Sequence, residues 1–235
     1  LSDYGSRLTQ EKGMKNQQDL KVGAWTGVGG EIDGRWMTRY GAWLKSESLL
    51  VEIVFIWPQT RDVELEKDIL RSAGEEPVRH DGFRRWKTFG MEFYANGAYK
   101  LGECKAEPGI ASMTFTHPKN PELLENFQRR GMVSEWLEAS VQEWLRVQIP
   151  GEIELHYQDS YEAAGHDVER IAGTQITGKL GRYGRKAIRY EATAWICPED
   201  NRLYSFRTKH LPEIADHSRA GERLACCNHL WVGNE

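Results

Sequence analysis

The 235-residue chain has an ordinary globular composition, with 40% hydrophobic and 28% charged residues and a net charge of −4. It carries no long run of like charge, so nucleic acid and anionic membranes are not expected partners. Its longest apolar run, Leu49 to Trp57, is far shorter than the roughly 20 residues of a membrane-spanning helix. With no signal peptide recognised at its start, we expect a cytoplasmic protein without a transmembrane segment.

The first third of the chain predicts a polar arm followed by an incomplete unit of β-hairpin plus helix. Residues 1–20 are polar with few apolar anchors, which is typical of an extended arm or of a segment that orders on a partner. The unit itself is expected over residues 21–78. Within it, Leu49–Trp57 is rich in β-branched and aromatic residues and predicts a central strand. Turns are expected at three glycines that lack the Lys and Ser/Thr of a phosphate-binding loop: Gly27, Gly29 and Gly30.

A helix is expected to close this unit, and a main domain is expected over residues 83–235. The helix begins near Asp62 and carries Leu65 and Ile69 four positions apart on one face. The main domain opens with a strand in which apolar residues alternate: Phe89, Met91 and Phe93. Asn96-Gly97 then predicts a hairpin turn.

The middle of the main domain predicts its longest helix. Asn120-Pro121 is typical of a helix start, with an N-cap followed by proline at the first helical position. Gly131 breaks or kinks the pattern, and Pro150-Gly151 ends it. Between these limits apolar residues recur at helical spacing: Leu123, Leu124, Phe127, Val133, Trp136, Leu137, Val141, Trp144 and Leu145.

The remainder of the chain predicts strands, a hairpin and a last helix. Five residues define one face of a long strand: Ile188, Tyr190, Ala192, Ala194 and Ile196. Pro198–Asn201 predicts a turn, and Arg202–Phe206 the returning strand. The last helix is expected over residues 212–231. The order of elements predicts an α+β fold, in which an antiparallel β-sheet has helices packed on its faces.

Several motifs follow one another in a characteristic order between residues 83 and 231: Trp86–Phe93, Gly109–Phe115, Glu135-Trp136-Leu137, Gly165-His166 and Trp195–Tyr204. This order resembles the PsbP-like sandwich fold, which is shared with the Ran-binding Mog proteins. Residues 22–74 resemble the closing half of such a unit, as a partial second copy. Members of this fold bind photosystem subunits or a small GTPase, so the resemblance implies docking on a larger assembly. It brings no catalytic residue with it.

Cys197, Cys226 and His229 form the sharpest polar cluster in the sequence. In the expected last helix Cys226 and His229 are three residues apart and could bind one ion, with Cys197 as a third ligand. A fourth ligand would come from another histidine, His166 or His210. Zinc suits such a set of thiolates and imidazoles. The alternatives are a disulfide from Cys197 to Cys226 or Cys227, and a structural role with no cofactor bound.

Tryptophans and arginines supply the candidate partner-binding residues. Trp36 and Trp43 lie in predicted strands of the incomplete first unit, where some of these rings could be exposed. Arg182, Arg185 and Arg189 form a local basic patch with neighbouring tyrosines. Exposed tryptophan near arginine is the composition of a protein-binding hot spot.

The sequence therefore favours a non-catalytic binding or accessory subunit that docks on a larger protein assembly. No Gly-x-Ser-x-Gly nucleophile motif occurs in it. One alternative is a metal- or thiol-dependent protein that uses Cys197, Cys226 and His229. Another is a carrier for a small apolar ligand, with a pocket between the sheet and the long helix.

Overall fold

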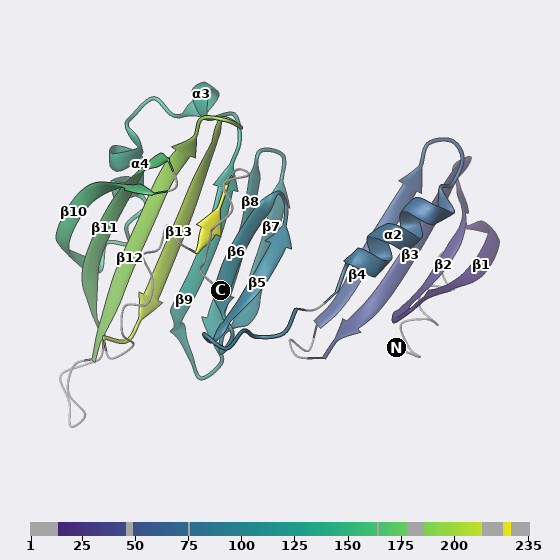
Figure 1. Cartoon of the computed structure of the whole chain (residues 1–235), viewed down its shortest axis with the longest axis horizontal. Helices are drawn as coiled ribbons and strands as arrows, with labels where there is room; N and C mark the ends of the chain where they lie inside the picture. The colour runs from purple at the N-terminus through teal and green to yellow at the C-terminus, as the bar shows by residue number, and fades with distance from the viewer. Residues whose placement is uncertain are drawn as a thin grey trace. The chain divides into compact units, whose positions relative to one another are not determined.

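The computed structural model describes residues 14–45, 49–74, 76–163, 165–177, 186–212 and 223–226. The chain divides into two compact units, residues 1–75 and 76–235 (Figure 1). Antiparallel strands account for 63% of the structure and short helices for 11%. The expected α+β class, with helices packed on the sheet faces, is therefore wrong, because the protein is mostly β.

The first unit is a four-stranded antiparallel sheet with one helix packed on it (Figure 1). The strands follow one another in sequence order, so β1 and β4 form the two edges. The elements are β1 Lys15–Val22, β2 Trp25–Ile32, β3 Arg35–Leu44, β4 Leu49–Trp57 and α2 Val63–Ser72. The predicted strand Leu49–Trp57 is confirmed, but it lies at an edge and not in the centre. β1 extends into the polar arm expected over residues 1–20.

Strand β2 contains the glycines that were expected to form turns. Gly27 and Gly29 face large side chains of the neighbouring strands. A Cβ atom at Gly27 would lie 2.8 Å from the Tyr40 ring, and one at Gly29 would lie 2.9 Å from Leu20 Cδ1. The turn itself falls later, at Asp33 and Gly34, where both residues have positive φ angles. Glycine in β2 therefore makes room for its neighbours.

Helix α2 packs on the sheet through Glu66 and Leu70, and not through the expected stripe of Leu65 and Ile69. Asp62 caps the helix, since its side chain accepts a hydrogen bond from the Leu65 backbone N–H at 2.9 Å. Leu70 is 1% exposed, whereas Leu65 is 46% and Ile69 37% exposed. The buried core beneath the helix is Trp25, Tyr40, Ala42 and Leu70.

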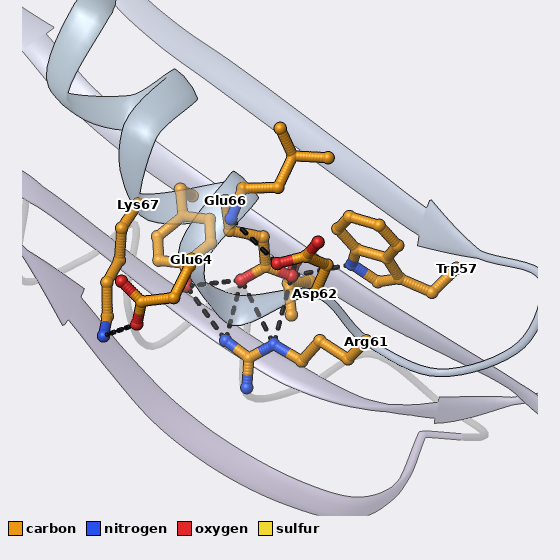
Figure 2. Close-up of polar contacts among 9 residues, drawn as sticks. Trp57, Arg61, Asp62, Glu64, Glu66 and Lys67 are labelled. Carbon is orange, nitrogen blue, oxygen red and sulfur yellow. Dashed lines mark hydrogen bonds and ion pairs between the residues drawn. The ribbon is translucent and has the colours of Figure 1, made fainter.

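Glu66 is a fully buried carboxylate that joins α2 to the sheet (Figure 2). Arg61 donates to both of its oxygens, the shortest contact being 2.7 Å. The Thr38 hydroxyl and the Trp57 indole N–H each donate at 2.7 Å, and the Tyr40 hydroxyl donates at 3.1 Å. Burial opposes ionisation, but the hydrogen bonds from Arg61, Thr38 and Trp57 outweigh it and hold the pKa of Glu66 below its usual value.

The second unit consists of two antiparallel sheets packed face to face. The large sheet has the order β10-β11-β12-β13-β9-β8-β7, and the small one β14-β6-β5. Their strands are β5 Phe83–Thr88, β6 Met91–Asn96, β7 Lys100–Glu107, β8 Ile110–His117, β9 Asn120–Arg130, β10 Ile153–Ala163, β11 His166–Thr177, β12 Lys186–Cys197, β13 Arg202–His210 and β14 Leu224–Ala225. Because β6 and β7 belong to different sheets, Asn96-Gly97 carries the chain from one layer to the other and makes no hairpin.

Aromatic rings fill the space between these two sheets. Phe93 of β6 stacks on Phe127 of β9, with ring centroids 4.2 Å apart. Phe127 in turn stacks on Phe206 of β13 at 4.7 Å. On the other face of the large sheet, α4 covers β11 and β12 and buries Leu145. The unit therefore has three layers, of which only one is helical.

The long helix expected from Asn120 to Pro150 is wrong. Its first part is strand β9, and the helical residues that follow form only α3 Val133–Trp136 and α4 Val141–Val147. Leu123 and Phe127 are four residues apart, a spacing that places them on one face of a strand as well as of a helix. Pairing with β8 and β13 on either side decides between the two. No helix in the described part of the chain is both long and apolar enough to cross a membrane.

A buried ion pair fixes the short strand β14. Arg223 donates to Glu125 at 2.6 Å and to the Tyr94 carbonyl at 2.8 Å. Its guanidinium also lies 4.9 Å from the centroid of the Phe206 ring. Residues 223–226 are thereby attached to β6 and β9. The expected helix over 212–231 is wrong at Leu224 and Ala225, and most of its other residues lie outside the described ranges.

We expect Glu66→Ala to destabilise the first unit by about 3 kcal/mol or more, because it leaves the Arg61 guanidinium and three other donors without their acceptor. Urea unfolding followed by tryptophan fluorescence measures this. Glu64→Ala is the matched control, since Glu64 lies on the exposed side of the same helix and pairs only with Lys67 among the ion pairs described. Equal unfolding midpoints for the two variants would contradict the structural role of Glu66.

We expect the stability difference between the wild-type protein and Glu66→Gln to shrink as the pH falls. The pKa of Glu66 is lowered in the folded state, so its ionised form stabilises the protein above the unfolded-state pKa. That contribution disappears as the pH drops through the folded-state pKa, where the wild-type side chain becomes neutral like glutamine. Urea unfolding at pH 7 and at acidic pH tests this, and a difference that stays constant would count against it.

Candidate functional site

The two predicted partner-binding tryptophans lie on opposite faces of β3. Trp36 faces the α2 side, where the Arg61 guanidinium lies 5.9 Å from its ring centroid. Trp43 is seven residues further along the strand and therefore points to the other face. Its side chain is 48% exposed. Only Trp43 therefore contributes to the face opposite α2.

The predicted basic patch belongs to the second unit. Arg189 lies in β12, is exposed, and stands opposite Thr174 and His210 on the neighbouring strands. Arg182 and Arg185 lie outside the described residues. A partner-binding role for the three arginines stays a prediction.

An apolar strip is exposed along β4, on the sheet face opposite α2. It consists of Trp43, Leu50, Val54 and Ile56, and we call it the β4 strip. The last three are 43%, 41% and 62% exposed. Trp43 pairs with Leu50 across β3 and β4, so the tryptophan extends the strip onto the neighbouring strand. The β-branched composition of β4 predicts a central strand with both faces buried, so the exposure of its alternate side chains is not expected from the sequence.

The surroundings of the β4 strip limit its extent and place an ion pair beside it. Glu52 lies between Leu50 and Val54 and forms an ion pair with Arg39 at 3.6 Å. Val28 lies on the same face in β2 but is only 1% exposed. The exposed apolar surface is therefore confined to the β3–β4 side of the sheet. A depression of about 410 Å³ adjoins its far end and is lined by Ile32, Asp33, Arg35, Met37 and Ile56.

Three potential metal ligands converge in the second unit: His166, Cys197 and Cys226. Their ligand atoms all lie within 4.8 Å of one another, and Cys226 Sγ is 3.4 Å from His166 Nε2. Cys197 is fully buried and His166 is 6% exposed. We call this group the cysteine–histidine cluster. It joins two residues of the predicted set, Cys197 and Cys226, to His166, whereas His229 lies outside the described residues.

The sheet register brings the cluster together. Glu169 pairs with Ala194 across β11 and β12, and the same register continued by three residues brings His166 opposite Cys197. Cys226 arrives from the other layer, directly after β14. The Tyr204 hydroxyl donates to Asp200 at 2.6 Å, and its oxygen lies 3.4 Å from the Cys226 carbonyl oxygen. Burial, followed by the bond to Asp200, raises the pKa of Tyr204, so it remains a neutral donor.

Comparison with known proteins gives likenesses at the level of structure. The chain is similar to the solution structure of cyanobacterial PsbP (CyanoP) from Synechocystis sp. PCC 6803, with a TM-score of 0.45 and 12% sequence identity over 66% of this chain and 98% of that one. No family model matches the chain, and no curated protein matches it. The resemblance drawn from the sequence named the same PsbP-like fold. The likeness to Ran-binding Mog proteins and the partial second copy stay predictions.

We expect the cysteines of the metal-free protein to differ in their reactivity towards iodoacetamide. Cys104 is exposed, although partial desolvation raises the pKa of its thiol. Cys197 is fully buried between the sheets, so it should be alkylated at least about tenfold more slowly, and only after local opening. Peptide mass spectrometry after timed alkylation in a chelator measures both rates. Equal rates would show that the two sheets do not enclose Cys197.

Proposed function

We propose that this protein is a non-catalytic accessory subunit that binds a partner protein through the β4 edge of its first unit. The proposal is carried by the β4 strip, in which three of the four outward side chains of an edge strand are exposed and apolar. A group of exposed apolar side chains on one element is typical of interaction sites, whereas single exposed apolar residues are common everywhere.

The edge position of β4 supports binding by strand addition. Among the described residues β4 pairs only with β3, so the backbone groups along its other side are available to a further strand. The strand has nine residues, longer than the typical five or six. Natural proteins block such edges with lysine, proline or bulges, and the outward positions of β4 carry one charge, Glu52. Helix α2 also exposes Leu65 and Ile69, but a helix offers no row of unpaired backbone groups.

The occupant that fits this edge is an extended segment of a partner protein. Its backbone would pair with β4, and alternate apolar side chains would lie over the β4 strip. A polar residue in the middle of the segment would lie beside the ion pair of Glu52 and Arg39. The depression next to Ile56 would receive one side chain at the end of the segment.

The other roles expected from the sequence stay predictions. A partner-binding role for Trp36, on the α2 side of the first sheet, and for the three arginines of the second unit is part of these predictions. A carrier of a small apolar ligand, a cytoplasmic location and the absence of nucleic acid among the partners likewise stay predictions.

We expect Val54→Lys and Ile56→Lys to weaken partner retention by about tenfold or more, because a desolvated ammonium would lie within the contact. The tagged full chain is used to capture a protein from extracts of the source cell, the captured protein is identified, and its amount is measured for each variant. Val147→Lys is the matched control, because Val147 is 81% exposed in the second unit and the charge change is the same.

Two results would overturn this proposal. One is undiminished retention of the identified partner by both β4 variants. The other is a wild-type protein that sediments as a dimer and becomes a monomer with Ile56→Lys, since the edge would then pair with a second copy of the chain. Far-ultraviolet circular dichroism of each variant checks that its sheet structure is retained.

A further inference from the structure

The cysteine–histidine cluster combines two sulfur ligands and one imidazole from three separate strands. His166 begins β11, Cys197 ends β12, and Cys226 follows β14. The three residues are 31 and 29 positions apart along the chain, by subtraction of their numbers. Their proximity is therefore produced by the packing of the second unit and does not reflect a local sequence motif.

The spacing of the cluster suits a tetrahedral metal. With zinc–sulfur and zinc–nitrogen bonds of about 2.3 and 2.0 Å, neighbouring ligand atoms in a tetrahedral site are roughly 3.3–3.8 Å apart. Cys226 Sγ and His166 Nε2 already have this separation, at 3.4 Å. The widest separation in the cluster, at most 4.8 Å, needs a shift of about 1 Å, which side-chain rotation supplies.

The chemistry of these donors selects the metal. Thiolate and imidazole together are the ligands of zinc in proteins, whereas magnesium and calcium prefer oxygen. We propose that His166, Cys197 and Cys226 bind one Zn²⁺ ion between the two sheets of the second unit. Three protein donors leave one tetrahedral position for water or a fourth donor.

Such a site would connect the two layers of the second unit. His166 and Cys197 belong to the large sheet, and Cys226 belongs to the segment that carries β14 of the small sheet. One ion bound to all three would hold the small sheet against the large one next to Trp195 and Tyr204. Because the ligands come together only in the folded chain, binding of the ion also stabilises the fold.

The test uses the purified full chain, stripped with a chelator, kept reduced and titrated with Zn²⁺ against a chromophoric competitor. We expect about one equivalent of zinc to bind per chain and a higher midpoint of thermal unfolding. His166→Ala and Cys226→Ser should each lower the affinity about 100-fold or more, whereas Cys104→Ser should not change it. Substitution with Co²⁺ should give the charge-transfer absorption of thiolate ligands.

Several outcomes would overturn the proposal. One is the lack of zinc binding by the wild-type protein, and another is unchanged affinity in both ligand variants. A Cys197–Cys226 disulfide in the protein as purified without reductant would also overturn it. Peptide mapping would locate such a bond, and the protein's mass would be lower than that of the reduced protein by two hydrogens. A ligand variant is informative only if its near-ultraviolet circular dichroism matches that of the chelator-treated wild type. If it does not match, the Co²⁺ spectrum of the wild-type protein decides the question. Thiolate charge-transfer absorption in that spectrum supports the site, and its absence refutes it.

Discussion

In each of the two units a buried glutamate with an arginine partner holds together segments that are distant along the chain. Arg61 and Glu66 connect α2 to β3 and β4 of the first sheet, and Glu66 would be costly to bury without these donors. Arg223 and Glu125 perform the same task between β14 and β9. The cysteine–histidine cluster depends on the second pair, because Arg223 brings Cys226 to the large sheet.

Elements with strong local signals could be predicted from the sequence. Strand β4 has the predicted bounds, Leu49–Trp57, because β-branched residues and a following proline define it locally. The turn after Pro198 joins β12 to β13 as predicted. Strand β9 was assigned to a helix because Leu123 and Phe127 fit both periods, and only its two neighbouring strands distinguish them. The buried face of α2 was missed because a glutamate occupies it.

The candidate sites depend on long-range pairing, which the sequence does not encode locally. Cys197 and Cys226 could be grouped by residue type, with His166 or His210 as a further ligand, but only the register of β11 and β12 brings His166 to Cys197. The β4 strip follows from the position of β4 at the edge of its sheet. A strand of this composition suits an edge position and a central position equally well. Only the order of the strands in the sheet shows that β4 is at the edge and that its alternate side chains are exposed.

The position of β14 has a consequence for the order of events during synthesis. Arg223 bonds the carbonyl of Tyr94 from 129 residues away, and it meets rings from three different strands. The small sheet therefore acquires its third strand only after the ribosome has made residues 223–226. Until then the side of β6 that receives Leu224 remains unpaired, and the growing chain carries an open sheet edge beside aromatic side chains. Nascent chains of this kind are substrates for chaperones.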